Sequence, residues 1–134
     1  MSDAIAGHEG DLVTKLSPRS VAETVAKFTD IVAAKGLRLF GVIDQSAEAS
    51  KVGLELRETT LVLFGSPAAG TPVMVAAPLS ALDLPLKILV WADGPQTKVT
   101  YVAPRALAAR YDLTTELAGH LAAIDPLTDA LVAD

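Results

Sequence analysis

The chain contains no cysteine, which excludes disulfide bonds, thiolate nucleophiles, iron–sulfur clusters and zinc–thiolate sites. Aromatic residues make up only 4% of the sequence, so the stacking platforms that bind single-stranded nucleic acid are largely missing. The 11 basic residues are scattered and the formal net charge is −5, whereas nucleic-acid binding depends on clustered lysine and arginine. We therefore expect no nucleic-acid partner, and we predict a reducing, cytoplasmic location.

Long apolar runs are missing as well. The longest, near residues 71–92, are interrupted by Asp83, Lys87 and two prolines, so they fall short of the roughly 20 residues of a membrane-spanning helix. We therefore expect no membrane partner. Residues 1–10 have neither a basic start nor an apolar stretch, and we interpret them as a flexible leader rather than a signal peptide. Residues 11–134 have the length of one domain with its own core.

The clearest local pattern predicts a helix that ends at Gly36. Ser17 is a suitable N-cap with Pro18 at the first helical position, and Ser20 with Glu23 has the form of a capping box. Apolar residues then recur at spacings of three and four, which places them on one face of the helix. They are Val21, Val25, Phe28 and Val32.

The rest of the chain alternates strand and helix patterns. The predicted strands are 11–16, 37–43, 59–64, 86–91 and 98–102, the last two joined as an antiparallel hairpin. The predicted helices are 46–52, capped by Asp44 and ended by Gly53; 72–77, with a strand as the alternative; 104–111; 115–124; and a last turn from Asp125. Strand 37–43 carries apolar residues on both faces, so we expect apolar neighbours around it. This order of elements predicts an α+β fold.

One segment, Gly65 to Thr71, has the glycine and threonine spacing of a phosphate-binding P-loop. The lysine of that motif is absent, so the cation that reaches the β- and γ-phosphates is missing. Pro67 also removes one backbone N–H group that would surround the phosphates. We therefore interpret the segment as a tight chain reversal, although a glycine-rich loop before a helix leaves binding of a smaller anion open.

No constellation of residues indicates a metal site or a nucleophilic enzyme. His8 and His120 lack a second ligand at metal-binding spacing, and we interpret His120 as a surface or partly buried helix residue. The sequence contains no Gly-x-Ser-x-Gly motif. Carboxylates such as Asp44 and Asp83 could form a general acid–base pair, but the sequence does not tell which of them meet. We predict neither a metal nor a cofactor.

The segment Asp83-Leu-Pro-Leu-Lys87 places an acid and a lysine on either side of an apolar bend. One interpretation is contact with a ligand. In the other, which we favour, Asp83 binds backbone amides around Pro85 and Lys87 lies on the solvent face of the following strand. Both residues stay among the candidates for a site.

Several short segments, spread over most of the chain, form a combination that matches a known family. They are Lys35-Gly36, Val42-Ile43-Asp44 with Ala49 and Gly53, Leu54-Glu-Leu-Arg57-Glu-Thr59, Phe64-Gly-Ser-Pro67 with Gly70-Thr-Pro72, Leu82-Asp-Leu-Pro-Leu-Lys87, Val90-Trp91 and Thr100-Tyr101. In this combination the chain resembles domain-of-unknown-function family 302. The resemblance implies an antiparallel sheet backed by helices, similar to the TATA-box-binding-protein arrangement, and it implies a homodimer.

The resemblance brings no known reaction, substrate or catalytic residue. The family tends to have histidine where Gln45 stands and asparagine where Ser66 stands. Because an amide does not titrate and ligates metals poorly, any proton-transfer or metal role of that histidine is lost at Gln45. The polar positions that survive, together with the Gly65–Thr71 segment, give the candidate ligand-binding residues. These are Asp44, Arg57, Ser66, Thr71, Asp83, Lys87 and Tyr101.

Three functions remain open. We favour a dimeric small-molecule-binding module, in which the Gly65–Thr71 and Asp83–Lys87 bends meet above an apolar sheet and enclose a pocket. The second is a cofactor-free enzyme, with Asp44 or Asp83 as base and Lys87 or Tyr101 polarising a carbonyl. The third is a protein-interaction or assembly domain that works through an exposed apolar patch.

Overall fold

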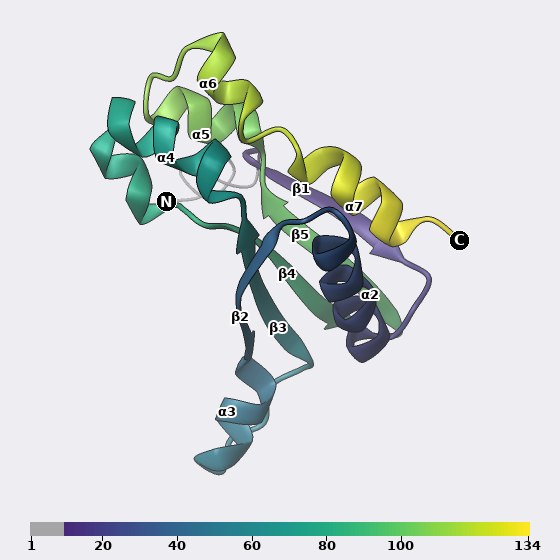
Figure 1. Cartoon of the computed structure of the whole chain (residues 1–134). Helices are drawn as coiled ribbons and strands as arrows, with labels where there is room; N and C mark the ends of the chain where they lie inside the picture. Colours follow the sequence, from purple (N-terminus) through teal and green to yellow (C-terminus); the bar gives the residue numbers. More distant parts are fainter. Residues whose placement is uncertain (1–9) are drawn as a thin grey trace.

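The structure is a computed structural model that describes residues 10–134, so the predicted leader lies outside the described residues except for Gly10. Five antiparallel strands form one sheet in the order β1-β5-β4-β3-β2 (Figure 1). The strands are β1 Leu12–Ser17, β2 Arg38–Asp44, β3 Thr59–Gly65, β4 Leu86–Asp93 and β5 Gln96–Val102. Helices back this sheet, which confirms the predicted α+β class.

Helical segments connect and cover the strands. They are α2 Val21–Ala34, α3 Gln45–Lys51, α4 Pro67–Ala76, the 3₁₀ helix η1 Pro78–Leu82, α5 Pro104–Arg110, α6 Thr115–Gly119 and α7 Ile124–Val132. In Figure 1, α2 and α7 lie against the sheet, α4, α5 and α6 gather at one end of it, and α3 projects from the opposite end.

Helix α2 begins at the predicted capping box and not at Ser17. Ser20 Oγ accepts from the Glu23 amide at 3.1 Å, and Glu23 Oε1 accepts from the Ser20 amide at 3.1 Å. Ser17 instead ends β1, and its hydroxyl contacts Thr24 Oγ1 at 2.7 Å. The two reciprocal bonds satisfy two amides at once, which a single serine cap does not do. Gly36, with φ of +70°, follows the end of the helix as predicted.

The core lies between the sheet and the helices α2 and α7. Phe28 of α2 and Phe64 of β3 pack edge to face, with ring centroids 4.9 Å apart, and both side chains are fully buried. Around them the inward-facing residues of β3, β4 and β5 meet the apolar stripes of the two helices. These are Val62, Ile88, Val90, Val99, Val32, Ile124, Leu127 and Leu131.

The opposite face of the sheet carries no such helix layer. Residues that stand opposite each other in antiparallel strands point to the same side, so the register identifies the outward face. Thr14 pairs with Thr100, Thr100 with Leu89, and Leu89 with Leu61. The outward side chains along these pairings are exposed or half-buried, and most of them are apolar. They are Leu12, Thr14, Leu16, Ile43, Leu61, Leu63, Leu89, Trp91 and Thr100.

Three local predictions are corrected by the structure. Strand β2 is an edge strand whose Phe40 and Val42 are largely exposed, because apolar residues on both faces occur at an uncovered edge as well as in a buried strand. Helix α4 begins at Pro67, well before residue 72, since Ser66 provides the cap. The predicted helix 115–124 ends at Gly119, and a longer helix than expected, α7, follows from Ile124.

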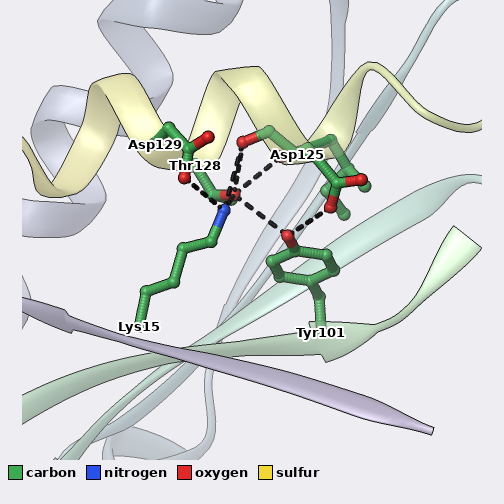
Figure 2. A network of polar contacts seen from close by, with 6 residues as sticks. Lys15, Tyr101, Asp125, Thr128 and Asp129 are labelled. Atoms are coloured by element: carbon green, nitrogen blue, oxygen red, sulfur yellow. Dashed lines mark hydrogen bonds and ion pairs between the residues drawn. The ribbon is translucent and has the colours of Figure 1, made fainter.

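A polar network joins α7 to the sheet (Figure 2). Tyr101 of β5 donates from its hydroxyl to Asp125 Oδ1 at 2.5 Å. Lys15 Nζ of β1 donates to Thr128 Oγ1 at 2.7 Å and lies 2.8 Å from Asp129 Oδ1. Burial of Tyr101, aided by the bond to Asp125, raises the pKa of its hydroxyl, which therefore stays a hydrogen-bond donor at neutral pH. The network holds α7 across β1 and β5.

We predict that Tyr101→Phe lowers the free energy of unfolding by about 1–3 kcal/mol, because the Asp125 carboxylate loses a donor in a partly buried site. Urea denaturation at pH 7 measures the change. Thr14→Val, which alters a hydroxyl on the outward face of the sheet, serves as the control and should shift the midpoint less. Equal stability of wild type and Tyr101→Phe would contradict a role for the network.

Candidate functional site

The end of the sheet nearest α4 brings two distant bends together. Strand β3 ends where β4 begins, because Phe64 pairs with Leu86 in the antiparallel register. The chain that leaves β3 through Ser66 therefore lies beside the chain that enters β4 through Pro85. The approach is close: a Cβ at Gly65 would lie 3.9 Å from Pro85 Cβ. The two bends that the sequence singles out thus meet at one place.

A cavity of about 360 Å³ opens between these bends. Its walls come from β2, the start of α4, the bend before β4 and the segment after α6, and they are mostly apolar. The lining residues are Phe40, Gly65, Ser66, Pro67, Ala69, Gly70, Thr71, Met74, Leu84, Pro85, Leu86, His120 and Leu121. This volume lies in the range of small-molecule sites, about 300–1,000 Å³.

The first turn of α4 forms one wall of the cavity. Ser66 is the N-cap, and its Oγ accepts from the Ala69 amide at 3.3 Å. Pro67 occupies the first helical position, where its missing N–H costs no hydrogen bond. Gly70 and Thr71 therefore lie inside a helix. The glycine-rich loop that the P-loop spacing suggested is not formed, because serine followed by proline starts the helix earlier.

His120 is the ionisable side chain of the cavity wall. Its Nδ1 lies 2.9 Å from the carbonyl oxygen of Ala69. Because a carbonyl only accepts, Nδ1 must carry the proton, and in the neutral ring Nε2 is then an acceptor. Within residues 10–134, Nε2 has no hydrogen-bond partner. The cavity thus combines apolar walls with one imidazole whose orientation is fixed.

Of the residues predicted for a site, Ser66 and Thr71 line the cavity. Asp83 and Lys87 flank the bend, but their polar groups contact other parts of the protein. Lys87 Nζ donates to the carbonyl oxygens of Asp83 and Pro85, each at 3.2 Å. Lys87 therefore stabilises the bend itself, which adds a contact to the structural interpretation of this segment.

The Asp83 carboxylate joins the bend to the end of α5. Its Oδ2 accepts from Arg110 Nη1 at 2.9 Å and from the Tyr111 hydroxyl. Partial burial opposes ionisation of this carboxyl, but the bonds from Tyr111 and Arg110 outweigh burial and hold its pKa below the ordinary value. Asp83 is thus an ionised structural anchor on the far side of the bend from the cavity lining.

The other three predicted residues lie elsewhere in the fold. Asp44 caps α3, where Oδ1 accepts from the Ala47 amide at 2.9 Å and from Ser46 Oγ at 2.6 Å. Arg57 lies 3.7 Å from Asp93 at the sheet's other end. Tyr101 belongs to the network under α7. The seven candidates therefore do not form a single cluster.

Several cavity residues were missed from the sequence. His120, Phe40 and Met74 are separated along the chain by 34 residues or more and share no motif. The one available signal was the order of strands: once β3 and β4 are taken as antiparallel neighbours, their loops must meet at one end. The position of α6 over that end had no such signal.

Two further searches concern metals and membranes. Among residues 10–134, no group of three or more histidine or carboxylate side chains is arranged to hold a metal ion. In the same part of the chain, none of the helices combines the length and the apolar character needed to cross a bilayer.

We predict that Asp83→Asn lowers the free energy of unfolding at pH 7 by about 1–3 kcal/mol, because bonds from Arg110 and Tyr111 to an ionised acceptor are lost. The folded-state pKa of Asp83 is depressed, so its contribution is present above the ordinary carboxyl pKa and disappears as pH falls through the lowered value. The difference from wild type should shrink between pH 5 and pH 2 (roughly) in urea titrations. Asp30→Asn, an exposed change on α2, is the control.

Comparison with known proteins places the chain among relatives. The family model "Domain of unknown function DUF302" matches residues 13–131. A protein named "Fluoride-specific ion channel FluC 1", from Brucella suis biovar 1 (strain 1330), is 37% identical over 106 residues, which cover 78% of this chain and 42% of that protein. Its namesake from Brucella abortus biovar 1 (strain 9-941) is also 37% identical, over 39% of its length. The chain thus spans about two fifths of the length of these curated relatives.

A solved structure shares the fold. The crystal structure of an uncharacterized conserved protein DUF302 from Bacillus stearothermophilus superposes with a TM-score of 0.77, covering 91% of this chain and 95% of the other. The sequences are 17% identical, so this likeness concerns the fold alone. With the family model matched over nearly the whole chain, this protein belongs to the DUF302 family.

Proposed function

We propose that this domain binds a small, largely apolar molecule with one hydrogen-bonding group in the cavity between the two bends. The observation that carries the proposal is the cavity of about 360 Å³, whose walls are apolar except for a few converging polar groups. Apolar walls favour a ligand by removing its surface from water, while a small number of polar groups fix its orientation.

The chemistry of His120 narrows the ligand class. Nδ1 is held on the Ala69 carbonyl, so the neutral ring offers Nε2 as an acceptor to a ligand hydroxyl or N–H group. When the imidazole is protonated, the same nitrogen becomes a donor to a carboxylate or carbonyl. An aromatic or aliphatic alcohol is the simplest molecule that satisfies both the apolar walls and the neutral ring.

The enzyme hypothesis gains no support from the arrangement of its proposed residues. Asp83 is occupied by Arg110 and Tyr111, Tyr101 by Asp125, and Asp44 by the cap of α3. Lys87 is bound to two backbone carbonyls. An acid–base pair would need groups that face a common substrate. Binding without turnover is therefore the function we favour.

We predict that Gly70→Leu abolishes binding without loss of the fold. A Cβ at Gly70 would meet Met74 Cε at 3.9 Å, an ordinary contact, so the larger side chain fits and occupies the cavity. Replacing glycine in a helix also favours folding, by roughly 0.5–1 kcal/mol. Binding of 1-naphthol, followed by its fluorescence, and native mass spectrometry of the freshly purified protein measure the effect.

Gly119→Leu is the matched control, because a Cβ there meets nothing within 4 Å and Gly119 does not line the cavity. It should bind 1-naphthol like the wild type. Naphthalene should bind more weakly than 1-naphthol to the wild type, by about 3–10-fold for one hydrogen bond, and His120→Phe should remove that difference. Equal naphthol binding by Gly70→Leu and wild type would place the ligand outside this cavity.

The curated relatives suggest a second candidate, in which the domain serves a fluoride-transporting system as a fluoride-binding accessory part. The support is the 37% identity over 78% of this chain to proteins named as fluoride-specific ion channels. If this alternative holds, sodium fluoride raises the melting temperature of the isolated domain and sodium chloride at equal ionic strength does not. Identical melting curves in the two salts would remove this candidate.

A further inference from the structure

The uncovered face of the sheet has the properties of a protein interface. Leu12 and Leu16 of β1 are 44% and 55% exposed, and Ile43 of β2 is 39% exposed. Between them Leu61, Leu63, Leu89 and Trp91 are half-buried. An antiparallel sheet with one solvated face normally alternates apolar inward and polar outward residues. Here both sides of β3 and β4 are apolar, and apolar patches of this extent mark interaction sites.

Polar groups in the middle of this face already have partners within it. Trp91 Nε1 donates to Thr100 Oγ1 at 3.0 Å, and Thr100 Oγ1 lies 2.9 Å from Thr14 Oγ1. Buried polar groups are costly only when their hydrogen bonds are unmade. This chain of three residues can therefore enter an interface without a large desolvation penalty.

Charged groups lie at the ends of the face and are also paired. Near the β4–β5 turn, Lys98 Nζ lies 2.6 Å from Asp93 Oδ2 and 5.4 Å from the centre of the Trp91 ring. At the other end, the Lys87 amine is held by the carbonyls of Asp83 and Pro85. The face thus presents an apolar middle with neutralised rims. This pattern gives no charge signal for an acidic or basic partner.

We propose that this face packs against the same face of a second copy of the chain, forming a homodimer through sheet-on-sheet contact. Two flat sheets with apolar inner faces pack about 10 Å apart, and a two-fold axis makes one patch complementary to itself. Five strands spaced about 4.8 Å apart, over some five or six residues each, give a face of roughly 400–500 Å² in plan. Because the accessible surface of side chains exceeds its plan, two such faces approach the roughly 1,200 Å² lower limit of specific interfaces.

Trp91 makes the proposal directly measurable. It is the sole tryptophan of the chain, and it lies in the middle of the proposed interface. In the dimer its indole is shielded from water, so its emission should shift to longer wavelength when dilution separates the copies. Light scattering should give about twice the 13.9 kDa monomer mass at high concentration, with both signals changing over the same concentration range.

Leu16→Lys is the decisive variant. The side chain is exposed, so a lysine is compatible with the folded monomer, but two copies would bury two unpaired charges near each other. We expect dimer dissociation to become at least tenfold easier, with an unchanged melting temperature of the monomer at low concentration. Val52→Lys, at an equally exposed apolar position beyond the end of α3, is the matched control and should leave the dimer intact.

Four results would overturn the proposal. The first is a wild-type monomer at 100 µM (roughly), a concentration at which even weak specific dimers form. The second is a dimer that Val52→Lys breaks and Leu16→Lys does not, which would move the interface to the region of α3. The third is a dimer that survives both lysines. The last is a monomer in which deletion of residues 1–9 newly exposes Trp91, which would assign that face to the chain's own N-terminal segment.

Discussion

The antiparallel register between β3 and β4 is the constraint on which the candidate site depends. Pairing of Phe64 with Leu86 sets the exit of one strand beside the entry of the next. Side chains then determine the shape of the space between: Gly65 lets Pro85 approach closely, while Phe40 and Met74 stand at the sides. A register shift of one residue would turn every β4 side chain to the other face and destroy core and cavity together.

The sheet separates three regions with different tasks. One face, under α2 and α7, carries the buried core that makes the domain stable. One end, under α4, α5 and α6, has a smaller apolar cluster around Val73, Leu107 and Leu121, and the cavity lies against it. The remaining face is left with apolar side chains and internally bonded polar ones. Because the regions share only the strands, changes in one need not reach the others.

Much of the fold could be predicted because its signals are local. The capping box of Ser20 and Glu23, the Asp44 cap and the hairpin between β4 and β5 each depend on a few neighbouring residues. The edge position of β2 could not be predicted, since its apolar residues satisfy the pattern of a buried strand equally well.

For the site, the sequence located both bends but misjudged which side chains matter. Asp83 and Lys87 attract attention as charged residues, yet their partners are Arg110, Tyr111 and two carbonyls. His120 gave the opposite error, because a lone histidine on a short helix is usually unremarkable. Its role follows from α6 lying over the end of the sheet, a long-range relation that no local pattern encodes.

Helix α3 stands apart from the rest of the molecule (Figure 1). None of its side chains is buried, and the base of the excursion is tied by a single bond in which the Thr59 amide donates to Ser46 Oγ. Such a segment opens at little cost, so its amide protons should exchange with deuterium long before those of the central strands. The excursion between β2 and β3 is accordingly the place where evolution, or an engineer inserting a label, can change chain length without disturbing the sheet.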